Sequence, residues 1–210
     1  MKRVTIILGL LMLLLPLAAW ADVIDLTNQG GYVTFTNAGL VSAQSELVSF
    51  NGISAPKGSA LGSVSFSTGA FTGANLFTGG TFSSTGSCFC VMGQGKWLAG
   101  LSGAPTKGKV ALFTGSFVGP ISWTVVSAVH DNYVFTLSGT IAGALWTGRD
   151  VTGTTTQTIY AYTDQWPTDH KGSIKVGTSQ LTVPEPGTLS LLGTGLLAVA
   201  GTVRRKLMRS

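Results

Sequence analysis

The sequence has few charged side chains, which make up only 10% of its 210 residues. Its formal net charge is +5, but the bases are concentrated at the two ends. Between Asp22 and Gly187, seven basic side chains stand against all eight acidic ones, so this body is nearly neutral. A nucleic-acid-binding face needs Lys and Arg clustered on the folded body. We therefore expect no nucleic-acid partner.

Helix-forming Lys and Glu are scarce in the body, whereas the chain contains 29 glycines and many Ser and Thr residues. Lys and Glu favour helices and Gly weakens them, so a helical bundle is excluded. Val, Phe, Leu, Ile and Trp recur throughout at low net charge, which argues against long disorder. We expect one domain over residues 22–182, large enough for a hydrophobic core.

Short runs of apolar residues alternating with Ser, Thr or Gly recur through this domain. Such runs, bounded by Gly, Pro or Asn, are typical of β-strands. No amphipathic helices separate them, so we predict an all-β fold, an antiparallel β-sandwich or a barrel-like domain, with a β-helix as the alternative. The clearest runs are Tyr32–Thr36, Ser63–Ser67, Gly80–Ser84, Cys88–Met92, Lys109–Phe113, Ser122–Val129, Asn132–Ser138, Ile141–Trp146, Thr154–Thr163, Gly172–Val176 and Gln180–Val183.

Residues 1–21 have the three parts of a secretory signal peptide. A basic start is followed by the apolar stretch Val4–Leu17 and by a small-x-small site, in which Ala19 and Ala21 precede Asp22. We expect export by the Sec machinery and cleavage by signal peptidase before Asp22. A permanent N-terminal anchor is the alternative, because the bulky Trp20 lies within the cleavage motif.

The other end of the chain also has three parts. A Pro-rich motif comes first, an uncharged stretch over Thr188–Val203 second, and a basic cluster last. As a helix, the stretch would span about 24 Å, slightly less than a bilayer core of about 30 Å. We expect a single transmembrane helix, with the basic cluster on the cytoplasmic side. The motif is Val183, Pro184, Glu185, Pro186 and Gly187, and the cluster is Arg204, Arg205, Lys206 and Arg209.

This order of motif, short apolar helix and basic cluster resembles the PEP-CTERM sorting signal of Gram-negative bacteria. The resemblance covers Val183–Arg209. It implies transient anchoring in the inner membrane, cutting near the motif by an exosortase-like transpeptidase, and delivery to the cell surface or medium, often beside exopolysaccharide. The same tail is also catalogued as an ice-binding protein C-terminal domain. An ordinary membrane anchor with a Pro-rich stem is the alternative.

Cys88 and Cys90 flank Phe89. On a strand they would share a face about 6.5 Å apart, near the upper limit for a disulfide. The alternatives are a strained bridge, pairing with another chain, or two free thiols. Two Cys supply half a tetrahedral metal site, and His130 and His170 add no ligand spacing. We expect no metal and no cofactor.

Imidazoles and carboxylates come close in sequence only at His130-Asp131 and at Asp164, Asp169 and His170. Adjacent strand residues point to opposite faces, so neither place forms a dyad by itself. The chain also lacks a nucleophile elbow, a phosphate loop and a zincin motif. We expect no enzyme; a secreted hydrolase using His130 or His170 is a minor alternative.

Tyr160 and Tyr162 share a predicted strand face, and Trp166 follows in a turn. Aromatic faces stack on sugar rings, so this trio is the candidate glycan contact of a carbohydrate-binding module. The competing interpretation is that the Tyr pair packs across strands, with Trp123 and Trp146 in the core.

Thr residues recur at every second position from 152 to 158 and would line one face of a strand. Flat ice-binding faces need several such rows, and no other row is evident, so we expect an ordinary exposed β-face. The row consists of Thr152, Thr154, Thr156 and Thr158. Together, the tail and the neutral body predict an exported, exopolysaccharide-associated structural or adhesive protein of the cell surface or matrix.

Overall fold

The computed structural model describes residues 22–36, 38–104, 108–130, 132–162 and 171–183. Over these ranges the protein consists of β-strands and two short 3-10 helices, which confirms the all-β prediction. The predicted signal peptide and the predicted C-terminal transmembrane helix lie outside the described residues. None of the helices in the described part of the chain has the length and apolar character that a membrane crossing needs.

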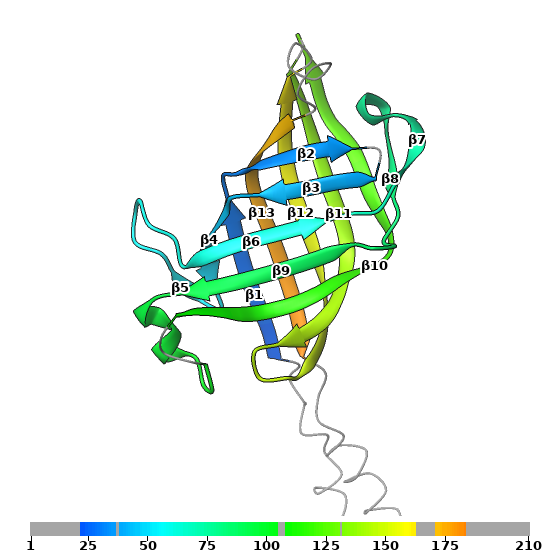
Figure 1. Ribbon diagram of the computed structural model, residues 1–210. Helices are drawn as coiled ribbons and strands as arrows, with labels where there is room; N and C mark the ends of the chain where they lie inside the picture. The colour runs from blue at the N-terminus through cyan, green and yellow to red at the C-terminus, as the bar shows by residue number, and fades with distance from the viewer. Residues whose placement is uncertain (1–21, 37, 105–107, 131, 163–170, 184–210) are drawn as a thin grey trace, which may run out of the picture. The chain divides into compact units, whose positions relative to one another are not determined.

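Thirteen strands form one sheet (Figure 1). They are β1 (Asp22–Gln29), β2 (Tyr32–Thr36), β3 (Gly39–Ala43), β4 (Ser45–Phe50), β5 (Ile53–Ser54), β6 (Gly62–Ser67), β7 (Phe71–Asn75), β8 (Gly79–Phe82), β9 (Cys88–Gln94), β10 (Lys109–Val129), β11 (Asn132–Leu145), β12 (Asp150–Tyr162) and β13 (Lys171–Val183). The 3-10 helices are η1 (Leu76–Thr78) and η2 (Lys96–Gly100).

The sheet closes on itself as an antiparallel barrel of eight strands. The ring runs β1-β4-β6-β9-β10-β11-β12-β13, and the pairing of β13 with β1 completes it. The hairpin β2–β3 bridges β13 and β6, while β8 and β7 extend outward from β10. The barrel-like form of the prediction is therefore confirmed. A β-sandwich and a β-helix are wrong, because one antiparallel sheet curves until its ends meet.

Two long strands each join runs that the sequence pattern predicted as separate strands. Lys109–Phe113 and Ser122–Val129 both belong to β10, and the two runs between 132 and 146 are joined in β11. In β10 the register with β11 shifts between Val118 and Ser122. Gly119, with a φ of 75°, and Pro120 occupy this shift. A bulge accommodates both a left-handed glycine and a proline that cannot donate to the ladder, so the strand continues past them.

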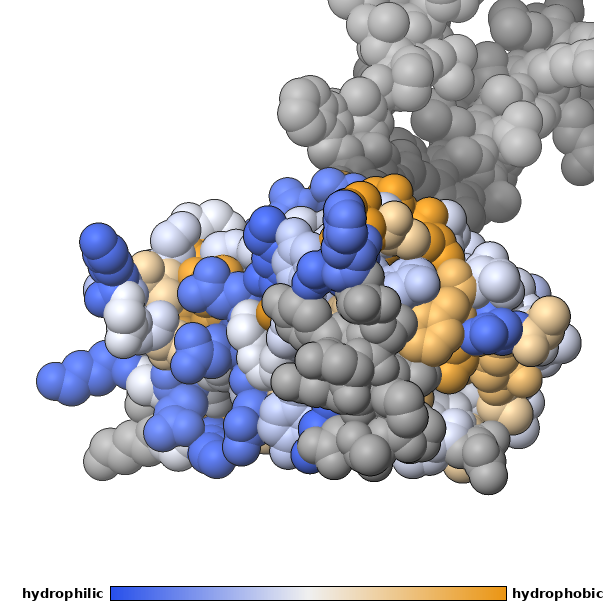
Figure 2. All heavy atoms as spheres, turned by 90° about the horizontal axis from the view of Figure 1, so that it is seen from above, coloured by the Kyte–Doolittle hydropathy of each residue, from blue (hydrophilic) through white to orange (hydrophobic). Residues whose placement is uncertain are grey.

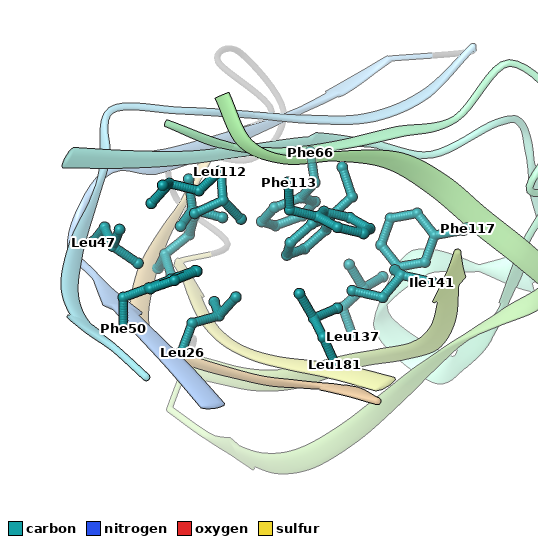
Figure 3. Packing of buried hydrophobic residues seen from close by; sticks show 14 of the residues in the cluster. Leu26, Leu47, Phe50, Phe66, Leu112, Phe113, Phe117, Leu137, Ile141 and Leu181 are labelled. Atoms are coloured by element: carbon teal, nitrogen blue, oxygen red, sulfur yellow. The ribbon is translucent and has the colours of Figure 1, made fainter. Parts of the chain in front are cut away.

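The barrel interior is filled by the apolar side chains that face inward from these strands (Figure 3). Trp123 is 1% exposed and stacks on Phe135 with ring centroids 4.4 Å apart. Its indole Nε1 donates to the carbonyl of Leu76 at 2.7 Å, which ties η1 to the core. Trp146 is half-buried and packs against the same cluster. Trp123 thus has the core position that the competing interpretation gave it.

A layer of polar side chains is also buried, where β1 closes the barrel. Asn28 Nδ2 donates to Ser45 Oγ at 2.7 Å and to Gln157 Oε1 at 2.9 Å. Gln157 Nε2 donates back to Asn28 Oδ1 at 3.3 Å and to Thr155 Oγ1 at 3.0 Å, and Ser179 Oγ donates to Thr155 Oγ1 at 2.7 Å. Every buried side-chain nitrogen and oxygen of the described residues has a partner. The seam between β4, β1, β13 and β12 is therefore held by a satisfied hydrogen-bond network.

The folded unit spans Val23–Val183. The start of β1 and the end of β13 lie at the same end of the barrel (Figure 1). Leu181 and Val183 are 0% and 2% exposed, so the chain is part of the core up to the residue before Pro184.

Candidate functional site

The Thr row of β12 points outward, as its spacing indicated. Thr152, Thr154 and Thr156 are exposed and Thr158 is half-buried. The odd-numbered residues between them face inward, and Thr155, at 1% exposure, joins the buried polar layer. The row is therefore a line of hydroxyl and methyl groups that runs along β12 on the outside of the barrel.

Further rows lie on both sides of it, so the expectation of a single row was wrong. On β11, Ser138 pairs with Thr156 and Thr140 with Thr154; on β13, Thr178 pairs with Thr156. These partners come from the preceding and the following strand, and the register that pairs them with β12 cannot be read from the spacing along β12 alone. We call this surface the hydroxyl face. It consists of Ser122 and Thr124 of β10, Thr136, Ser138 and Thr140 of β11, Thr152, Thr154, Thr156 and Thr158 of β12, and Thr178, Gln180 and Thr182 of β13.

The hydroxyl face carries no charge. The sequence has no Asp, Glu, Lys or Arg after Lys109 in β10, in all of β11, after Asp150 in β12 or after Lys175 in β13. Exposed apolar side chains lie on the same strands, with Val118 at 53% and Val176 at 38% exposure. The face therefore offers neutral hydrogen-bonding groups with methyl groups between them.

The end of the barrel that carries the β10–β11 turn has a mixed surface. Figure 2 shows mostly hydrophilic atoms there, with hydrophobic atoms gathered in one band. Val126 and Val129, near the end of β10, are 63% and 57% exposed. His130 follows in the turn, with an exposed side chain and a φ of 44°.

A depression extends from the edge of the hydroxyl face onto β1, where β13 lies between β1 and β12. The depression has a volume of about 460 Å³. Its polar side chains come from all three strands: Asp25 and Thr27 of β1, Thr154 and Thr156 of β12, and Thr178 and Gln180 of β13. Leu26 and Ser179 also line it, and the buried Thr155 and Gln157 alternate with the outward residues of β12.

The predicted aromatic trio is described only at Tyr160. This residue continues the Thr row of β12 and is half-buried. Lys175 Nζ donates to the Tyr160 hydroxyl at 2.8 Å and lies 5.0 Å from the ring centroid, so one ring face is occupied by the ammonium. Tyr162 ends β12, and Trp166 lies outside the described residues, so the grouping of the trio stays a prediction.

Cys88 and Cys90 are both free thiols on the outer face of β9. Cys88 is exposed, and its Sγ lies 3.2 Å from Ser67 Oγ. Cys90 is half-buried beside Ser65 and Thr114 on the neighbouring strands.

Of the candidate acid–base residues, the structure describes only His130. Its backbone carbonyl accepts a hydrogen bond from Asn132 Nδ2 at 3.0 Å. Asp131, Asp164, Asp169 and His170 lie outside the described residues. Within the described ranges, no three His, Cys, Asp or Glu side chains come together in a group that could hold a metal ion.

Comparison with known proteins identifies one segment. Residues 182–206 match the model of the PEP-CTERM protein-sorting motif, which confirms the predicted sorting signal. The chain is thus exported, processed at a membrane by an exosortase-like system and placed at the cell surface. No curated protein and no solved structure matches the chain.

Proposed function

We propose that this protein is a structural or adhesive, non-enzymatic component of an exopolysaccharide layer. Sec export and signal peptidase would deliver a chain that begins at Asp22. The tail would hold it transiently in the inner membrane of a Gram-negative cell until an exosortase-like enzyme cuts near Pro184–Gly187. The released or surface-linked product would be the barrel alone.

The observation that carries this proposal is the uncharged hydroxyl face of an exported domain. Neutral polysaccharides present hydroxyl groups that both donate and accept hydrogen bonds, and Thr, Ser and Gln side chains do the same. The Thr and Ser side chains, which make up most of the face, are short, so little conformational entropy is lost when they are held by a ligand. Weak contacts repeated along a polymer add up to firm retention, which is what a matrix component needs.

A carbohydrate-binding module is the second candidate, and the position of Tyr160 favours it. Tyr160 lies at the end of the same outward row as Thr152–Thr158. A sugar chain that follows β12 would therefore pass from the hydroxyl groups to the ring of Tyr160.

Fractionation of the native extracellular matrix tests the proposal. The protein should elute with high-molecular-weight polysaccharide in size-exclusion chromatography. It should shift to the size of the free barrel after the polysaccharide is degraded with periodate, while a periodate-treated control of the purified protein keeps its elution position. Elution as a free barrel before degradation, or recovery only in membranes, would contradict the proposal.

A further inference from the structure

The depression at the edge of the hydroxyl face has a width that suits one polymer chain. It extends from β1 across β13 to β12, which is two strand spacings or about 9.6 Å. Along the strands, outward side chains repeat about every 6.6 Å, so Thr154 and Thr156 face Gln180 and Thr178 across each step. Successive units of a chain would therefore meet equivalent pairs of side chains.

The sheet beneath the depression is held by hydrogen bonds on its inner side. Thr155 and Ser179 are hydrogen-bonded to each other beneath it at 2.7 Å, and Gln157 is tied to Asn28 of β1. Both β12 and β13 are paired along both edges of this segment. A ligand would meet side chains whose backbone is already fixed, which lowers the ordering cost of binding.

The lining selects the ligand class by charge. Five of the six outward polar side chains are neutral groups that donate and accept, and Asp25 adds a carboxylate that accepts from sugar hydroxyls. A polyanion would need Lys or Arg in the track, and would meet the Asp25 charge instead. A protein partner would be expected to find an apolar or aromatic centre, whereas this track is lined by hydroxyl and amide groups.

The hydroxyl rows alone would also suit an ice surface, but the barrel does not present them flat. The rows lie on adjacent strands of a closed sheet, and such a sheet twists and curves from one strand to the next. A flexible chain can follow that curvature, whereas a crystal plane cannot.

We propose that the depression formed by Asp25, Thr27, Thr154, Thr156, Thr178 and Gln180 binds a neutral glycan chain that runs along β12 and β13. This inference deepens the proposed function by giving the matrix polymer its binding site and its chemical class. Recognition uses hydrogen bonds to sugar hydroxyls, with the methyl groups of the Thr residues against the sugar C–H groups.

Binding of the native exported protein to immobilised polysaccharides tests the proposal. The probes are the neutral polymers dextran and galactomannan, with alginate as the anionic comparison. The site variant is T156V/T178V, which removes two hydroxyl groups and keeps the side-chain shape. The matched control is S63A/S65A on β6, where Ser63 lines a different depression. Thermal melting of each variant checks that the barrel is intact.

The expected result is retention on a neutral polymer, weakened about tenfold in T156V/T178V and unchanged in S63A/S65A. Stronger binding to alginate, no binding to either neutral polymer, or equal binding by T156V/T178V would each overturn the inference. The proposed function has a separate readout. If the matrix fraction still holds the protein and W166A alone releases it, the track is wrong while the matrix role stands.

Discussion

The closure of the barrel depends on Asn28, and replacing this residue by Ala tests that dependence. Asn28 is fully buried on β1 and makes three hydrogen bonds, one to Ser45 and two with Gln157. In Asn28→Ala, Gln157 Oε1 loses the partner that Asn28 Nδ2 provides. Ser45 Oγ still donates to the carbonyl of Gln29 at 3.4 Å, and Gln157 Nε2 still donates to Thr155.

The loss of stability in Asn28→Ala follows from the hydrogen bonds that are broken. One newly unpaired buried acceptor costs about 1–3 kcal/mol, and each further lost hydrogen bond about 0.5–1.5 kcal/mol. We expect the free energy of unfolding to fall by about 2–6 kcal/mol. For a domain of this length, that corresponds to a drop in melting temperature of roughly 4–24 °C.

Thermal unfolding of the mature exported protein, followed by circular dichroism, measures the effect. The matched control is Gln29→Ala, the exposed neighbour on β1, which should change stability by less than about 0.5 kcal/mol. The double variant Asn28→Ala/Gln157→Ala should lose less than the sum of the single changes, because the two side chains are coupled. Melting of Asn28→Ala within about 1 °C of the Gln29→Ala control, a smaller shift than a loss of 1 kcal/mol would cause, would refute the reasoning.

Three further predictions concern the interior and the thiols. Trp123→Ala should lower stability by about 3–5 kcal/mol, and Trp123→Phe by less although it leaves the Leu76 carbonyl without its donor; chemical denaturation measures both. Gly177→Ala should destabilise the barrel strongly, because a Cβ at Gly177 would collide with the amide oxygens of the buried layer, and low yield with a lowered melting point would show it. Alkylation before denaturation should label Cys88 faster than Cys90, and both should be labelled after denaturation. A monomer that resists alkylation and is lighter by two hydrogen masses would contain a disulfide, which would contradict the prediction of free thiols.

Local alternation explains how much of this fold the sequence could predict. Ser63–Ser67 has the inside–outside pattern that its residue types indicate, and the outward Thr row of β12 follows from its spacing, since both depend only on neighbouring positions. The length of β10 could not be predicted, because Gly119 and Pro120 signal a turn while the register shift turns them into a bulge. The conformational propensities of single residues do not distinguish a turn from a bulge within a continuous strand.

The candidate site depended on pairing that local patterns do not contain. Asn28 and Gln157 are 129 positions apart in sequence and meet only when β1 pairs with β13. The hydroxyl face likewise arises from the register that places Thr178 beside Thr156. The sorting signal was predictable for the opposite reason, since its motif, apolar stretch and basic cluster are contiguous in the chain.

The junction between barrel and tail limits where the chain can be cut. Leu181 and Val183 are buried, and Thr182 pairs with Thr152. Removing them would expose part of the core and shorten the last strand of the ring. Processing should therefore occur at or beyond the bond after Val183.

The intact mass of the native protein from membrane and extracellular fractions tests the central claim most directly, namely that a folded barrel is exported and freed from its sorting tail. The account predicts a species that begins at Asp22 and ends between Val183 and Gly187, recovered outside the membrane. A membrane-bound species that retains Arg204–Ser210 as its only form, or a product cut before Leu181, would contradict it.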